Sequence, residues 1–104
     1  MKAIVVEIAQ VVDDSAYPPL VECLLVDAKG QTHRFVEKDA IVTSTAVVIG
    51  ALPALGVIAC EVESQWVDSE GRSLVSAVTT RPWGVESTAG SSNFVVFAEQ
   101  LREV

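Results

Sequence analysis

Hydrophobic and polar residues alternate along this chain in segments that are joined in pairs by turns of the same chemistry. The turns, residues 27–30 and 68–71, both place aspartate first and glycine fourth. This order is typical of a type I turn, and a left-handed residue at the glycine adds a β-bulge to the connection between two strands. The pattern therefore predicts an all-β fold built from hairpins that turn at residues 27–31 and 68–72.

The second hairpin has the clearer pattern, because one face of residues 58–67 is apolar and the other is mostly polar. Glu61 and Glu63 are predicted to lie on the solvent face. A bulged turn gives three cross-strand pairs: Trp66 with Leu74, Val62 with Val78, and Cys60 with Thr80. The predicted buried face consists of Ile58, Cys60, Val62, Trp66, Leu74 and Val78.

The pattern of the first hairpin allows two registers. A bulged turn places Cys23 opposite Phe35 and Leu25 opposite His33, with these side chains toward the core. A two-residue turn places Leu24 opposite Phe35 instead, because a one-residue slip moves every side chain to the other face. The sequence leaves both registers open.

The remaining segments complete a small single-domain barrel or sandwich of about six to seven antiparallel strands. Acidic residues and a proline pair predict a loop at residues 13–19, and residues 98–104 can form one or two helical turns in which Leu101 packs inward. Residues 46–56 stay open between strand, loop and short helix. The other predicted segments are strands at 2–12, 20–26, 32–37 and 40–44, an apolar segment at 46–49, a Gly/Pro loop at 49–56, a strand from 57, and a third hairpin between 85–87 and 93–97.

Composition limits the classes of function. The 104 residues carry 14 acidic and 7 basic side chains, which gives a net charge of −7, and 50% of the residues are hydrophobic. This charge repels phosphate backbones and anionic membranes, and it favours basic partners. Nucleic-acid binding is excluded because the basic residues are scattered and are not interleaved with aromatic residues.

Residues 40–60 contain no charged side chain, and a run of this length is long enough to cross a bilayer as a helix. Thr43, Ser44 and Thr45 interrupt the run, and glycines and a proline divide its second half. We therefore predict no membrane segment. The N-terminal residues lack the pattern of a signal peptide, so we expect a cytoplasmic protein.

Candidate chemistry is sparse. Cys23 and Cys60 are predicted to be buried thiols without a disulfide, because the cytoplasm is reducing, and their spacing matches no metal or redox motif. The sequence contains neither a Gly-x-Ser-x-Gly motif nor a phosphate-binding glycine loop. We expect no cofactor and no metal, and we assign no catalytic residue.

His33 is the single histidine, and Arg34 follows it. A histidine can act as a general base when a carboxylate orients it, and Asp27 and Glu37 are nearby in the sequence. A histidine on the surface of a strand is the simpler interpretation. The alternative function is a small β-barrel that binds or acts on a small-molecule ligand at a mouth lined by His33 and Arg34.

Trp83 lies at a predicted bend between Pro82 and Gly84. Its indole either caps one end of the barrel or lies on the surface with Arg81 and Glu86 nearby. Tryptophan and arginine are the residue types that most often anchor protein interfaces.

Leu52 and Leu55 of the 49–56 loop either tuck under the barrel or form an exposed contact, which could join copies of the chain in a homo-oligomer. We predict a non-enzymatic protein-binding domain with an acidic surface that favours a basic protein partner, as in an inhibitor or immunity protein. The candidate binding residues are Trp83, Arg81, Glu86, Leu52, Leu55, His33 and Arg34.

Overall fold

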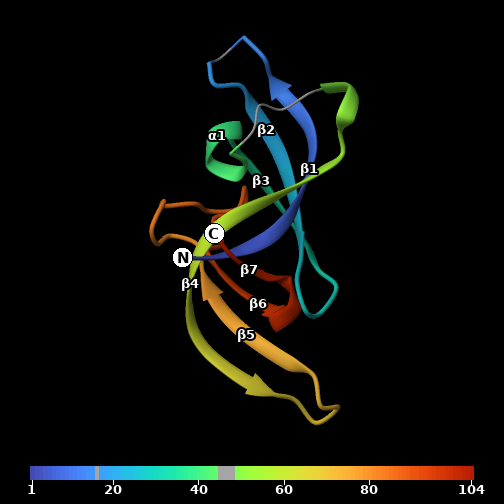
Figure 1. The fold of residues 1–104 in the computed structure, drawn as a ribbon, viewed down its shortest axis with the longest axis vertical. Helices are drawn as coiled ribbons and strands as arrows, with labels where there is room; N and C mark the ends of the chain where they lie inside the picture. Colours follow the sequence, from blue (N-terminus) through green and yellow to red (C-terminus); the bar gives the residue numbers. More distant parts are fainter. Residues whose placement is uncertain (16, 45–48) are drawn as a thin grey trace.

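The structure is a computed structural model, and it describes residues 1–15, 17–44 and 49–104. Within these ranges, seven antiparallel strands form a sheet that curls into a half-barrel (Figure 1). The predicted all-β fold is therefore confirmed. The strands are β1 (Lys2–Asp13), β2 (Leu20–Val26), β3 (Thr32–Lys38), β4 (Ala54–Val67), β5 (Ser73–Val78), β6 (Asn93–Phe97) and β7 (Leu101–Glu103).

β1 is the central strand of the sheet, whose order is β3-β2-β1-β4-β5-β6. The first half of β1 pairs with β4 on one side and with β7 on the other, and its second half pairs with β2. Ile4, Val6 and Ile8 of β1 are buried, as the alternation predicts. A long strand with several partners holds the two hairpins together.

The hairpin turns have the predicted geometry. Gly30 and Gly71 have φ values of 82° and 80°, in the left-handed region that glycine tolerates. The register of the first hairpin, which the sequence left open, is the bulged one, because Cys23 lies opposite Phe35. The aspartate that opens each turn accepts hydrogen bonds from backbone N–H groups two and four residues later.

β4 contains a bulge at Glu63 that the sequence pattern does not predict. Trp66 lies opposite Leu74, as predicted, but the register then shifts between Val62 and Ser64. Val62 consequently pairs with Ala77 and not with the predicted Val78. The predicted pair of Cys60 with Thr80 is also wrong, since β5 ends at Val78, which lies opposite Glu61.

The bulge changes which side chains are buried. One extra residue moves the following side chains to the other face of the strand. Trp66 therefore lies on the outer face and is 40% exposed, so its predicted place in the core is wrong. Ile58, Cys60 and Val78 are buried as predicted, Val62 and Leu74 are partly buried, and Glu61 and Glu63 are exposed.

The segment between β3 and β4 differs from its prediction. The predicted strand at 40–44 is wrong, because Asp39–Val42 forms a short helix, α1, whose Val42 is buried in the core. The predicted apolar segment at 46–49 falls mainly on residues 45–48, which lie outside the described residues. The 49–56 loop is wrong in its second half, since a 3₁₀ turn (Ile49–Ala51) leads into β4 at Ala54. No helix in the described part of the chain is long and apolar enough to span a membrane.

The C-terminal third also departs from its prediction. β6 pairs with β5, and residues 85–87 form no strand, so the predicted third hairpin is wrong. A turn nevertheless lies where it was expected, because Gly90 N–H donates to the Ser87 carbonyl at 2.9 Å. The predicted helical end is partly right: Ala98–Gln100 forms a 3₁₀ turn, but β7 follows it and places Leu101 against the core.

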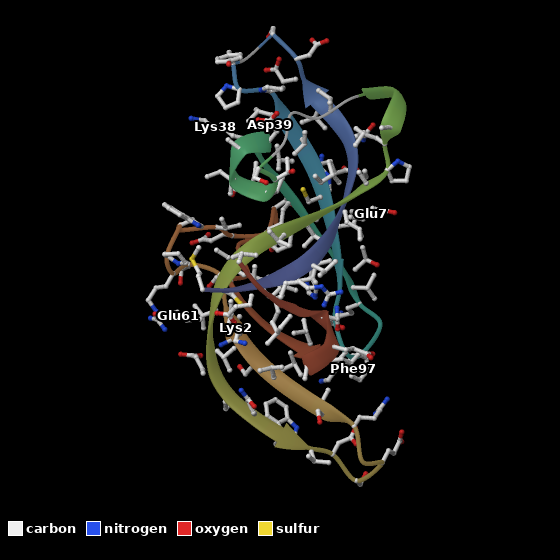
Figure 2. All side chains as sticks on the ribbon, viewed as in Figure 1. Lys2, Glu7, Lys38, Asp39, Glu61 and Phe97 are labelled. Atoms are coloured by element: carbon white, nitrogen blue, oxygen red, sulfur yellow. The ribbon has the colours of Figure 1, made fainter. Side chains whose placement is uncertain are left out.

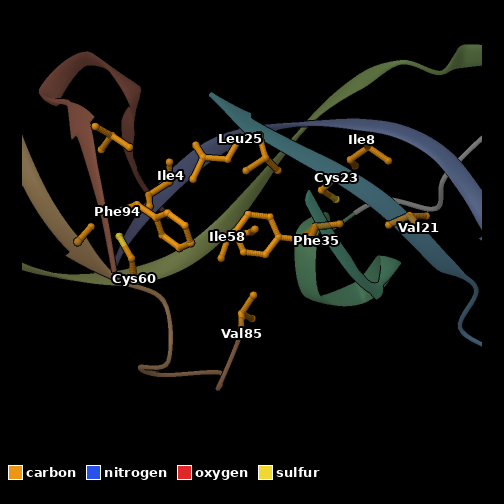
Figure 3. Close-up of a cluster of buried hydrophobic side chains, with 14 of the residues drawn as sticks. Ile4, Ile8, Val21, Cys23, Leu25, Phe35, Ile58, Cys60, Val85 and Phe94 are labelled. Carbon is orange, nitrogen blue, oxygen red and sulfur yellow. The ribbon is translucent and has the colours of Figure 1, made fainter. Parts of the chain in front are cut away.

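The core fills the concave side of the half-barrel (Figure 3). Phe35 and Phe94 meet edge to face, with ring centroids 5.6 Å apart, and join the two halves of the sheet. Cys23 and Cys60 are buried free thiols within this cluster. The buried cluster comprises Ile4, Val6, Ile8, Val21, Cys23, Leu25, Phe35, Val42, Ile58, Cys60, Val75, Ala77, Val85, Phe94 and Val96.

The two ends of the sheet, β3 and β6, approach each other through their neighbouring turns. Ala28 N–H of the first hairpin turn donates to the Val95 carbonyl of β6 at 2.9 Å. Thr88 N–H donates to the Arg34 carbonyl of β3 at 2.8 Å. These bonds hold the sheet in its curled shape and fix the position of the segment between β5 and β6.

Candidate functional site

The turn that carries Trp83 is built on two buried residues. Thr79 and Val85 are 0% and 1% exposed, and Thr79 Oγ1 donates to the Val85 carbonyl at 2.8 Å. Between them, Gly84 N–H donates to the Thr80 carbonyl at 2.7 Å, with Gly84 at φ 68°. The Trp83 indole is 57% exposed. The sequence allowed the indole either to cap one end of the barrel or to lie on the surface, and in the structure it lies on the surface.

Arg81 connects this turn to β4. Its guanidinium hydrogen-bonds to the Glu61 carboxylate, and Nη2 lies 3.5 Å from Oε2 of Glu63. Glu63 also accepts a hydrogen bond from Asn93 Nδ2 at 3.1 Å. The guanidinium is therefore engaged within the molecule, where it holds the Trp83 turn against the sheet. Glu86, on the same segment, is exposed.

An open pocket of about 550 Å³ lies beside the turn. Its lining combines Arg81 and Pro82 of the turn with residues from the start of β1 and from β4. Its full lining is Met1, Lys2, Cys60, Glu61, Val62, Arg81 and Pro82. The pocket therefore adjoins the turn that carries Trp83.

The outer face of β4, β5 and β6 carries an apolar row that sequence reasoning missed. Trp66, Leu74 and Phe97 lie opposite one another on successive strands. Directly opposed side chains of neighbouring strands have Cβ atoms about 4.5–5.5 Å apart, so the row is continuous. We call these residues the outer row. The signal for it was weak, because both faces of residues 74–78 are largely apolar in the sequence.

Charged groups border the outer row. Arg72 lies over the Phe97 ring, 5.5 Å from its centroid, and pairs with Asp68 at 2.8 Å and with Glu70 at 3.5 Å. A hollow of about 370 Å³ opens beside Phe97 and is lined by Arg72, Ser73, Phe97, Ala98 and Glu99. Figure 2 shows Phe97 at this end of the sheet and Glu61 towards the end that carries the Trp83 turn.

His33 and Arg34 do not form one site. Neighbouring residues of a strand point to opposite faces. The His33 ring is oriented by Asp27, with Nε2 and Oδ2 2.8 Å apart, and its centroid lies 4.9 Å from that of Phe94. Arg34 instead pairs with Glu22 of β2.

The Asp27 carboxylate also serves the turn. Burial raises its pKa, but hydrogen bonds from His33 and from the backbone N–H groups of Gln31 and Lys29 outweigh burial, so this pKa lies below its ordinary value. In the part of the chain that the structure describes, no hydroxyl or thiol hydrogen-bonds to the imidazole. The arrangement stabilises the hairpin turn.

Leu52 and Leu55 are separated by the start of β4. Leu52 is partly buried and packs against the core, so it tucks inward as one interpretation allowed. Leu55 is 76% exposed and lies opposite Glu7 of β1. The contact between copies through residues 49–56 stays a prediction, with Leu55 as its exposed side chain.

The structure does not bring Leu55 and Trp83 together. Arg81 fixes the Trp83 turn at Glu61, six residues along β4 from Leu55. At a rise of about 3.3 Å per residue, these points on the strand are roughly 20 Å apart. Another open pocket, of about 560 Å³, lies at the Leu52 end of the molecule against residues 9–15.

Among the residues with described positions, no three His, Cys, Asp or Glu side chains are grouped so that they could hold a metal ion. No family model, curated protein or solved structure matches this chain.

Proposed function

We propose that this chain is a non-enzymatic protein-binding domain and that Trp83 anchors its partner. The observation that carries this proposal is the 57% exposure of the indole on a turn held by the buried residues Thr79 and Val85. Tryptophan is enriched among the few residues that supply most of the binding energy of an interface. A turn that is already ordered also loses little conformational entropy on binding.

Arg81 supports this role as a positioning residue. Its ion pairs with Glu61 and Glu63 tie the turn to β4, and they also satisfy the guanidinium. Ion pairs at such exposed positions contribute little to global stability. Loss of Arg81 should therefore loosen the turn more than it destabilises the fold.

The partner is expected to be basic. The chain has a net charge of −7. Three of its arginines are already paired with acidic residues of the same chain, so their guanidinium groups are not free to repel a positive partner. A positive partner would be attracted to this surface over the distance that salt screening permits. An inhibitor or immunity protein that binds a basic target has these properties. The pairs are Arg34 with Glu22, Arg72 with Asp68 and Glu70, and Arg81 with Glu61 and Glu63.

The test is capture of partners by the immobilised wild-type protein, by Trp83→Ala and by Tyr17→Ala, from a lysate of the source cells. Tyr17 is 99% exposed and serves as the matched aromatic control. We expect a protein that wild type and Tyr17→Ala retain and that Trp83→Ala loses. With that protein purified, Trp83→Ala should weaken binding by about 2 kcal/mol or more, roughly 30-fold in Kd.

The melting temperature of Trp83→Ala separates binding from folding. It should stay within error of wild type, because the indole is mostly outside the core. Equal capture by wild type and Trp83→Ala would contradict the proposal. A large drop in melting temperature would instead assign the indole a structural role.

A further inference from the structure

The outer row, Trp66, Leu74 and Phe97, is a second apolar surface that the Trp83 turn does not use. Trp66 is 40% exposed, whereas most indoles in proteins are largely buried. Leu74 and Phe97 are partly buried beside it. The row crosses three strands, so its backbone is held by the sheet ladders on either side of β5.

The hollow beside Phe97 gives this surface a place for a side chain. It measures about 370 Å³, and its floor and walls combine the apolar Phe97 and Ala98 with the charged Arg72 and Glu99. Glu99 is exposed, and its carboxylate has no ion-pair partner among the described residues. A cationic side chain that enters the hollow would find this carboxylate at its rim.

The charges around the row determine which partner it fits. Arg72 is neutralised by Asp68 and Glu70, so this cluster carries a net negative charge. Glu99 adds another. A second copy of the chain, at a net charge of −7, would be repelled. Charge complementarity therefore favours a positive partner over self-association.

We propose that the outer row docks a segment of a partner protein that presents apolar side chains flanked by lysine or arginine. The apolar side chains cover Trp66 and Leu74, and a cationic side chain enters the hollow at Phe97 and pairs with Glu99. This inference rests on the proposed function and adds a second contact surface to it. Trp83 supplies the anchor at one end of the sheet, and the outer row supplies a docking groove at the other.

The experiment uses a synthetic amphipathic peptide of lysine and leucine, with its glutamate–leucine counterpart as the charge control. Titration into the ¹⁵N-labelled full chain should shift the amide signals of residues 66, 74 and 97–99 most. We expect Trp66→Ala and Glu99→Lys each to weaken binding by at least about fivefold, and added salt to weaken it further. Glu99 is exposed, so its variant should fold even if Trp66→Ala does not.

Each other outcome overturns the inference. Shifts spread over the acidic surface, with Trp66→Ala and Glu99→Lys binding as wild type does, would mean attraction by net charge alone. Equal binding of the glutamate–leucine peptide would contradict the proposed preference for a basic partner. Self-association that Trp66→Ala abolishes, measured by sedimentation, would assign the row to a second copy.

Failure of this inference can be told apart from failure of the proposed function. Trp83→Ala should bind the lysine–leucine peptide as wild type does, because Trp83 lies outside the outer row. If Trp83→Ala loses partner capture but the wild-type protein binds no peptide, the proposed anchor is supported and the docking role of the outer row is wrong. If the peptide binds at the outer row but Trp83→Ala captures the partner as wild type does, the docking role of the outer row is supported and the proposed anchor is wrong.

Discussion

Replacement of Gly56 by alanine should destabilise the protein, because the glycine allows two elements to approach β4 closely. An added Cβ would lie 2.8 Å from Cδ1 and Cγ1 of Ile8 and 2.8 Å from the Val42 carbonyl oxygen. Carbon atoms in contact are normally about 3.5–4.0 Å apart, so the methyl group overlaps its neighbours by up to about 1 Å. Glycine inside a strand often marks such a close approach.

The magnitude follows from how little these neighbours can move. Ile8 is 2% exposed and Val42 is 0% exposed, so both are held by the core. Overpacking of this kind typically costs about 1–3 kcal/mol. In a domain of about this size, each kcal/mol lowers the melting temperature by roughly 4–8 °C. We therefore expect Gly56→Ala to melt about 5–20 °C below wild type.

Gly50→Ala is the matched control, since a Cβ at Gly50 meets no atom within 4 Å. Its free energy of unfolding should change by less than about 1 kcal/mol, and it could rise because alanine restricts the unfolded chain. Thermal and urea denaturation of the three proteins measure both effects. Equal stability of Gly56→Ala and Gly50→Ala would refute the reasoning, because it would mean that Ile8 and α1 do not pack against β4 as described.

Two further predictions concern the second hairpin. Backbone N–H donation from Arg72, followed by the pairing with its guanidinium, holds the pKa of Asp68 below its ordinary value despite some desolvation. A carboxyl group with a depressed pKa stabilises the fold above about pH 4, and this stabilisation is lost as the pH falls. The free energy of unfolding of Asp68→Asn should therefore depend less on pH than that of wild type between about pH 5 and 2.5, as denaturation across this range measures. Identical pH dependence of the two proteins would count against the hydrogen bonds of the turn. The variant Trp83→Phe leaves Trp66 as the single tryptophan, and acrylamide should quench the Trp66 fluorescence in the native state. Emission that is blue-shifted and shielded from acrylamide would instead place Trp66 in the core.

Local chemistry made much of the fold predictable from the sequence. An aspartate and a glycine at fixed offsets set both hairpin turns, and Gly30 and Gly71 take the left-handed conformation that this pattern requires. The alternation in residues 2–8 likewise predicted the buried face of β1. Each of these signals depends on a few neighbouring residues, which is why sequence reasoning could find them.

The errors came from long-range structure. Residues 40–44 are apolar enough for a buried strand, but the chain forms α1 there, which packs against β3 and β4 and buries Val42 in the core. Gly56 falls in the predicted loop, yet it lies inside β4, where Ile8 and the Val42 carbonyl approach so closely that there is no room for a side chain. In both cases tertiary packing decides the local conformation, and packing partners are not visible in a short window of sequence.

The candidate site was predictable only in part. The bend at Trp83 followed from the proline and glycine around it, but the sequence left the exposure of its indole open. The clamp by Arg81 depends on β4, some twenty residues earlier in the chain. His33 and Asp27 are brought together by the turn that both flank. The outer row left only a weak signal in the sequence, because Trp66 joins Leu74 and Phe97 on one face only through the bulge at Glu63.

That bulge has a physical reason in the packing of the indole. The hairpin of β4 and β5 extends beyond the core (Figure 1), and on its inner side near the turn Val67 is 65% exposed. Without the bulge, regular alternation would place Trp66 on that uncovered side. With it, the indole lies in a row with Leu74 and Phe97 and more than half of its surface is covered. One extra residue in β4 thus improves the burial of Trp66 and also leaves an aromatic edge exposed on the outer face.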